Sequence, residues 1–213
     1  MTHRKMSLTR LIEVPEVEMQ VSKLVNSMLN LCQGYRQLEM KCMSDDVNLP
    51  TFGRMFELIR QLEHRRVEEL IRFQVCRGQK ITWFDLKPVE KLDCIKPVNL
   101  FQTILTLEKE IHKLTTKLDS LAWEKSDFAL NSYLRTRVIL RQVKVIRKRS
   151  NQLRNLKRSE DDKIPFLTAR LTGRFEVEKL ERELQMERTR REWRIENDYE
   201  REHLKSIGST YRF

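Results

Sequence analysis

The chain has 213 residues, of which 39% are hydrophobic and 34% charged, with only five glycines and five prolines. This composition allows a buried core, argues against a turn-rich β fold and favours long helices. The net charge of +11 suits phosphate, acidic-protein or anionic-lipid partners. No run of 18 apolar residues occurs, so we expect no membrane-spanning segment.

The N-terminus and the cysteines both bear on the compartment of the protein. Residues 1–17 begin with several basic side chains and contain no long apolar run, which predicts a flexible basic arm and excludes a secretory signal. An organelle transit peptide is the alternative. The four cysteines form no C-x-x-C pair, so we expect free thiols in a reducing compartment. The cytoplasm is the preferred location, and the mitochondrion is the alternative.

Two helices are predicted in the first third of the chain. Apolar residues recur at helical spacing over residues 17–43, and the polar segment 44–46 interrupts the pattern. Asn48 is predicted to cap a second helix, with Pro50 in its first turn. Gly78 is placed to end this helix.

A long connection over residues 79–97 separates this pair from two further helices. Its apolar content predicts that it lies along the surface of a bundle. The third helix is expected over residues 98–123 and the fourth over residues 127–158, from the same periodicity. Two tightly joined helices, a long crossover and two more tightly joined helices are the order of a ferritin-like bundle. We therefore predict an all-α, up-down four-helix bundle with one long crossover over residues 18–158.

The C-terminal quarter is predicted to lie outside this bundle. Residues 159–173 form a linker with room for a short fifth helix. Residues 174–213 follow as a charged helical extension, in which glutamate and arginine alternate around a thin apolar stripe. A solvated single helix is the simplest interpretation of residues 174–205, and a partner-binding or coiled-coil helix is the alternative.

Five short stretches of the sequence resemble animal ferritins, in the same order and at the same separations. These stretches are residues 45–49 (DDVNL), 77–81 (RGQKI), 107–109 (LEK), 142–146 (QVKVI) and 155–157 (NLK). The resemblance runs without gaps from Val21 to Arg158. It implies a subunit of a hollow shell that stores ferric mineral, in which catalytic subunits bind a pair of iron ions inside the bundle.

The resemblance also locates the iron site, and that site is incomplete. The first-helix glutamate of the family is Met28 here, and the histidine of its E-x-x-H pair is Arg66. The family positions that remain are Glu63, Glu108, Gln142 and Tyr35. A thioether is a poor iron ligand and an arginine is always protonated, so the site has lost two ligands and gained a cation.

Three interpretations of these remaining side chains stay open. Buried acids without a counter-charge are costly, which predicts an internal salt-bridge cluster of Glu63, Arg66 and Glu108. The alternative is weak binding of a single iron ion through Glu63, Glu108 and Gln142, and a working diiron oxidase is a third reading.

Two further regions named by the resemblance have lost negative charge. Family shells admit iron through pores lined by acids near the start of the fourth helix, and the matching positions are Ser132 and Arg135. An arginine ring there would oppose cations. Of the acids expected toward the cavity on the second helix, two are replaced by Leu62 and Arg65, and Glu68 remains.

The fourth predicted helix is strongly basic. Residues 132–158 contain ten lysines and arginines and no acidic residue, with the densest cluster at Arg147, Lys148 and Arg149. This basic face is predicted either to pair with the acids of residues 174–205 or to bind a nucleic acid or an acidic protein.

We therefore predict a ferritin-family subunit that is non-catalytic, because its ferroxidase ligands are partly lost. It would form a homo- or hetero-oligomer with ferritin subunits, bind iron weakly and require no cofactor. The alternative is a scaffold, a helical bundle that binds polyanions or proteins and no longer handles iron.

Overall fold

The computed structural model describes residues 14–87, 97–161 and 174–190, and every element in these ranges is helical. The helices are α1 (Pro15–Met43), α2 (Pro50–Cys76), α3 (Pro97–Glu124), α4 (Phe128–Tyr133), the π-helix η1 (Leu134–Ile139), α5 (Leu140–Asp161) and a C-terminal helix over residues 174–190. The predicted all-α fold is confirmed. None of the described helices is both long and apolar enough to cross a bilayer.

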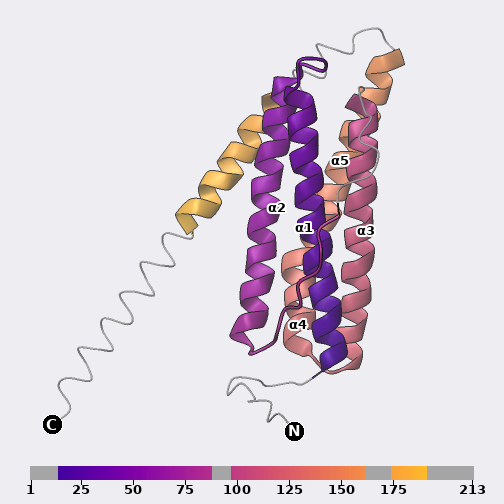
Figure 1. The fold of residues 1–213 in the computed structure, drawn as a ribbon. Coiled ribbons are helices and arrows are strands. Elements are labelled where there is room, and N and C mark those ends of the chain that lie inside the picture. Colours follow the sequence, from indigo (N-terminus) through magenta and orange to yellow (C-terminus); the bar gives the residue numbers. More distant parts are fainter. Residues whose placement is uncertain (1–13, 88–96, 162–173, 191–213) are drawn as a thin grey trace, which may run out of the picture.

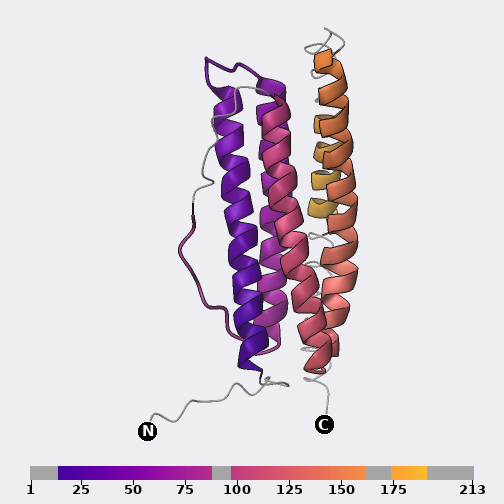
Figure 2. The same cartoon turned by 90° about the vertical axis from the view of Figure 1, so that its right-hand side faces the viewer.

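The helices form a bundle in which α1 packs against both α2 and α3, and α3 packs against α5 (Figures 1 and 2). A tight turn joins α1 to the antiparallel α2. The crossover then returns along the bundle, so that α3 runs in the direction of α2 (Figure 1). α4, η1 and α5 follow one another without a break and together form the fourth long helix. The predicted order of elements is confirmed, whereas the π-helix was not expected.

The turns at the two ends of α2 differ in how well they were predicted. Asn48 does not cap α2, because the N-cap is Leu49, which makes no side-chain capping bond. Asn48 has a φ of 46°, and its N–H donates to the carbonyl of Ser44 at 2.8 Å. Asparagine tolerates this left-handed conformation better than most residues, so it closes the turn. Gly78 follows α2 with a φ of 73°, as predicted for a helix-ending glycine.

The described part of the crossover lies along α1, as predicted. The N–H of Thr82 donates to Ser22 Oγ at 3.0 Å, and the N–H of Lys87 donates to the side-chain oxygen of Asn30 at 2.9 Å. Its apolar side chains are less buried than expected, and Trp83 is 65% exposed. Backbone bonds to α1 therefore position this segment more than apolar packing does. Residues 88–96 lie outside the described part of the chain.

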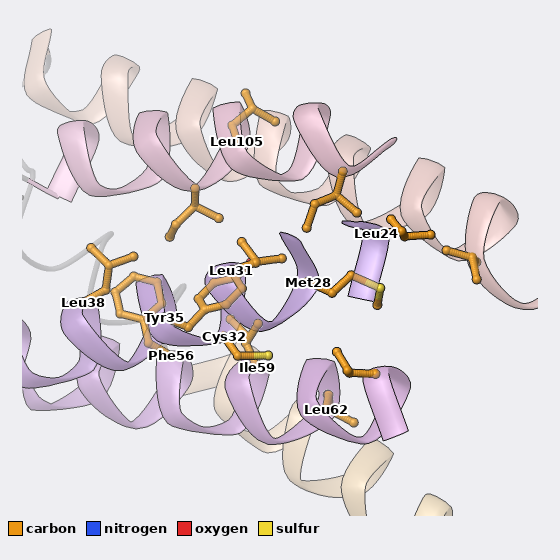
Figure 3. Packing of buried hydrophobic residues seen from close by; sticks show 14 of the residues in the cluster. Leu24, Met28, Leu31, Cys32, Tyr35, Leu38, Phe56, Ile59, Leu62 and Leu105 are labelled. Atoms are coloured by element: carbon orange, nitrogen blue, oxygen red, sulfur yellow. The ribbon is translucent and has the colours of Figure 1, made fainter. Parts of the chain in front are cut away.

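The core is centred on aromatic rings from α1, α2 and α3. The rings of Tyr35, Phe56 and Phe101 are fully buried, and their centroids lie 6.4 Å and 5.9 Å apart along this series. Figure 3 shows Tyr35 and Phe56 side by side, with Met28 further along α1 in the same core. The aromatic cluster thus fixes the three helices that carry Met28, Glu63 and Glu108.

The C-terminal helix packs against the bundle, so the interpretation of a solvated single helix was wrong for residues 174–190. Leu180 and Leu184 are buried and belong to the core cluster. Two leucines at i and i+4 therefore make an apolar stripe wide enough to dock this helix. Figure 1 shows the helix beside α2, and its ion pairs to Arg54 and Lys148 place it across α2 and α5. The predicted fifth helix within 163–173 and residues 191–205 lie outside the described residues.

The central position of Phe56 leads to a stability prediction. Phe56→Ala should lower the free energy of unfolding by about 3–5 kcal/mol, because it removes buried surface and leaves a cavity. Urea denaturation followed by circular dichroism measures the loss. The matched control is Phe128→Ala, since Phe128 is 57% exposed. Equal losses for the two variants would contradict this description of the core.

Candidate functional site

The site is built around a buried ion pair on α2. Glu63 and Arg66 are three residues apart, so their side chains share one face of the helix. The guanidinium of Arg66 donates to the Glu63 carboxylate. The same guanidinium forms an ion pair with Glu183 of the C-terminal helix, with Nη2 3.5 Å from the carboxylate oxygen. Arg66 thus joins the interior of the bundle to the C-terminal helix.

Arg66 remains charged in this setting. Burial favours loss of its proton, but the carboxylates of Glu63 and Glu183 outweigh burial and raise the pKa of Arg66 above its ordinary value. A permanent positive charge therefore occupies the interior of the bundle beside Glu63.

Glu108 of α3 has a different partner from the one predicted. It is 1% exposed and accepts a hydrogen bond from the Tyr35 hydroxyl at 2.6 Å. The predicted cluster of Glu63, Arg66 and Glu108 is therefore wrong in its third member, because a tyrosine from α1 reaches Glu108. Burial, followed by the nearby charge of Glu63, raises the pKa of Glu108 to about 7. The hydroxyl of Tyr35 is also buried, which places its pKa well above the ordinary value.

A small cavity lies between these side chains. Its volume is about 20 Å³, and its wall includes Met28, Glu63, Arg66, Glu108 and Gln142. This volume suits a particle the size of a water molecule and excludes an organic ligand. Within the described residues, two buried atoms of the wall have no hydrogen-bond partner: Arg66 Nε and Gln142 Oε1.

The oxygen atoms around the cavity are a poor match for iron, which prefers several carboxylates and an imidazole. Glu63 is bonded to Arg66, and Glu108 is bonded to Tyr35. Met28 contributes a buried thioether in place of a carboxylate (Figure 3). Among the described residues, no three His, Cys, Asp or Glu side chains come together as a metal site.

The C-terminal helix covers the part of α2 next to the site. Arg65 reaches both the carbonyl of Leu184, at 3.4 Å, and the carboxylate of Glu187, at 3.8 Å. Leu62 is buried in the core cluster instead of facing a cavity. Glu68 is half-buried and pairs with His64 and Arg72 of α2. The positions that the resemblance assigned to a cavity surface are therefore largely covered by this chain itself.

Sequence reasoning missed the two elements that close the site. Glu183 supplies a second carboxylate to Arg66, and its only sequence signal is its position beside the buried Leu184. The π-helix η1 contributes Arg137 and Val138 to the cavity wall. π-helices occur often at functional sites of helical proteins. No residue pattern in residues 134–139 had indicated this one.

The predicted basic cluster of α5 is divided among three environments. Arg147 is exposed, whereas Lys148 forms an ion pair with Glu176 of the C-terminal helix. Arg149 is only 3% exposed and donates to Gln152 at 2.8 Å. The prediction of one shared basic face was wrong for Arg149, because successive residues of a helix point in different directions.

The residues matched to a pore differ in their surroundings. Ser132 is exposed. Arg135 forms an ion pair with Asp119 at 3.1 Å, and its guanidinium carbon lies 5.9 Å from the ring centroid of Trp123. The charge of Arg135 is therefore paired within the subunit.

The cysteines Cys32, Cys42 and Cys76 are free thiols, and Cys94 lies outside the described residues.

Comparison with known proteins gives a consistent result for most of the chain. A family model described as the ferritin-like domain matches residues 17–159. The chain is 27% identical to soma ferritin of Lymnaea stagnalis over 143 residues, which cover 67% of this chain and 82% of that protein. It is 29% identical to ferritin light chain 1 of Rattus norvegicus over 143 residues, 67% of this chain and 78% of that protein.

The pKa of Glu108 predicts a pH-dependent difference in stability. A carboxyl whose pKa rises from 4.5 to about 7 on folding stabilises the fold below pH 4.5, and this contribution is lost as the pH rises through 7. Glu108→Gln stays neutral, so it should gain stability relative to the parent between pH 5 and pH 8, by up to about 3 kcal/mol. Urea denaturation at both pH values measures the gain. Glu110→Gln, at an exposed position of the same helix, is the control, and an equal gain there would contradict the assignment.

The packing of the C-terminal helix predicts a local effect of one substitution. Leu184→Asp should undock residues 174–190, because it would bury an unpaired carboxylate. Hydrogen exchange of their amides should then approach the rate of an unfolded segment. Met186→Asp introduces the same charge at an exposed position of the same helix and should leave protection unchanged. Full protection in the Leu184 variant would show that the helix does not depend on this contact.

Proposed function

Because the ferritin-like domain matches residues 17–159, this chain belongs to the ferritin family, and we propose that it is a subunit without ferroxidase activity of its own. The observation that carries the proposal is the guanidinium of Arg66, which lies inside the bundle against Glu63. It stands at the position where the family resemblance places a metal-binding histidine. The loss of iron oxidation then follows from the positive charge of Arg66 and from the small number of oxygen donors that remain around the cavity.

The charge of Arg66 opposes a ferrous ion directly. Two unit charges about 4 Å apart interact by about 4 kcal/mol at the effective dielectric of a protein, so a divalent cation would be opposed by about twice that amount. To ligate iron, Glu63 would also have to give up its bond to Arg66 and leave a buried cation unpaired. Breaking a buried ion pair on one side is strongly unfavourable.

The remaining oxygen donors do not offset this cost. Burial and the charge of Glu63 raise the pKa of Glu108, which favours its neutral form and weakens it as a donor for iron. One oxygen of the Glu108 carboxyl already accepts a hydrogen bond from the hydroxyl of Tyr35. Gln142 offers a neutral amide oxygen, which is a weaker donor for iron than a carboxylate. Weak binding of a single ion is the most that this set supports.

The proposed role is therefore structural: a subunit that assembles with itself or with catalytic ferritin subunits. Family membership supports assembly. The docked C-terminal helix agrees with a subunit that does not use this side of α2 for iron, because Arg65 and Arg66 are both engaged by that helix. The free thiols of Cys32, Cys42 and Cys76, the cysteines that the structure describes, fit a reducing compartment such as the cytoplasm.

Restoring the missing ligands tests the proposal. The parent protein should oxidise ferrous iron under air no faster than buffer does, as followed by the absorbance of ferric products. The double variant Met28→Glu, Arg66→His adds a carboxylate and an imidazole and removes the cation. It should oxidise iron faster than the parent, on the order of tenfold or more, a modest share of typical catalytic enhancements.

A third protein, with a single substitution of Arg66, provides the control. Arg66→Gln removes the cation without adding a ligand and should remain inactive, which separates ligand loss from charge. Oxidation by the parent protein that is abolished by Glu63→Ala would overturn the proposal, since it would show a working site. Size-exclusion chromatography of the parent, alone and with a catalytic ferritin subunit, reports whether a shell-sized particle forms.

A further inference from the structure

Two exposed aromatic rings lie at the turn between α3 and α4. Trp123 and Phe128 are each 57% exposed, and their ring centroids lie 5.4 Å apart in an edge-to-face arrangement. Arg135 adds its guanidinium to this group, with the guanidinium carbon 5.9 Å from the centroid of the Trp123 ring. Tryptophan and arginine are among the residues most enriched at the energetic centre of protein interfaces. We name Trp123, Phe128 and Arg135 the α3–α4 corner.

Buried polar contacts beneath the corner hold it in place. The buried carboxylate of Asp119 accepts a hydrogen bond from Arg135 at 3.1 Å and another from the side-chain amide of Asn131 at 2.7 Å. The buried carboxylate of Asp127 caps α4 by accepting the N–H of Leu130 at 3.1 Å. Because these contacts fix the backbone around the two rings, little ordering is needed when the corner binds another surface, which lowers the entropic cost of association.

Small uncharged side chains lie next to the corner on both helices. Ser120 precedes Trp123 by one turn of α3, and Ser132 lies between Phe128 and Arg135 along the following helix. The exposed small residues of this surface are Ser120, Ser126, Ala129 and Ser132. Small side chains allow a second surface to approach the rings closely, and a low density of charged residues is typical of the core of an interface.

The charged residues of this region are mostly paired within the chain, which favours a second copy as the partner. Three ion pairs join Arg135 to Asp119, Lys125 to Glu16, and Arg77 to Asp127. Among the charged residues of 119–135, only Glu124 has no ion pair within the described part of the chain. Two copies therefore meet few like charges here, although each carries a net charge of +11. An acidic partner would find no unpaired cation at the corner.

We propose that the α3–α4 corner is a contact between copies of this chain, in which the rings of Trp123 and Phe128 are buried against the neighbouring subunit. Burial of large aromatic rings supplies the affinity, and the arginine stacked on Trp123 keeps that ring in its orientation. This inference rests on the proposed function, because a structural subunit must bind other subunits, and it names the surface that does so. It does not involve the side chains around the cavity.

Removal of one ring tests the contact. Trp123→Ala should raise the dissociation constant of the self-assembled full-length protein on the order of tenfold or more, as expected when a residue at the centre of an interface is truncated. Native mass spectrometry over a dilution series measures the distribution of oligomers. Circular dichroism should show the helix content of the parent, because the Trp123 side chain is more than half exposed in the subunit.

Two further variants make the test specific to this surface. Phe175→Ala is the control, because it removes a ring that is 68% exposed on the C-terminal helix, and it should leave the dissociation constant unchanged. Ala129→Glu adds the same charge to every copy at an exposed position beside Phe128. It should weaken assembly at low salt, and part of the loss should be recovered at high salt, where like charges are screened.

Three results would overturn this inference: a parent protein that stays monomeric at every concentration, the same dissociation constant for the parent and Trp123→Ala, or equal weakening by Trp123→Ala and Phe175→Ala. Assembly with a catalytic ferritin subunit alone, weakened by Trp123→Ala, would overturn it by assigning the corner to that partner. Iron oxidation is measured separately. A result against the corner leaves the missing ferroxidase activity untouched, and iron oxidation by a protein whose assembly depends on Trp123 contradicts only the missing activity.

Discussion

A buried guanidinium held by a carboxylate of its own helix is the interaction on which the rest of the site depends. Arg66 cannot lose its charge and cannot be left unpaired, so Glu63 must face it. Once Glu63 is committed, Glu108 is the only other carboxylate of the expected ligand set, and its ionisation is disfavoured by burial and by the charge of Glu63. Arg66 therefore accounts for the changed role of Glu63, whereas burial and the bond from Tyr35 account for that of Glu108.

The same guanidinium connects the site to the C-terminal helix. Glu183 adds a carboxylate from outside the bundle, and the buried Leu180 and Leu184 hold the helix that carries it. Exposed ion pairs are worth little by themselves, so the two leucines supply most of the docking energy and the ionic contacts fix the register. The C-terminal extension and the altered site thus belong to one arrangement, in which the side of α2 beside Arg66 is covered.

Much of the fold could be read from the sequence, because helical periodicity and Gly78 are local signals. The positions of Met28, Glu63 and Arg66 inside the bundle followed from the family resemblance. The predictions that were wrong depended on the direction of a side chain or on its partner from another helix. Three consecutive cations diverge around a helix, which buries Arg149, and the partner of Glu108 comes from another helix. Two leucines in a charged stretch gave too weak a pattern to predict docking.

Iron chemistry in this subunit depends on what lies between Glu63 and Glu108. A crystal structure of the protein soaked in cobalt(II), recorded at the cobalt absorption edge, tests it most directly, because anomalous scattering identifies a bound metal. We expect no anomalous peak between these carboxylates, with Arg66 bonded to Glu63. A strong peak at this position, with the side chain of Arg66 turned outward to solvent, would contradict it.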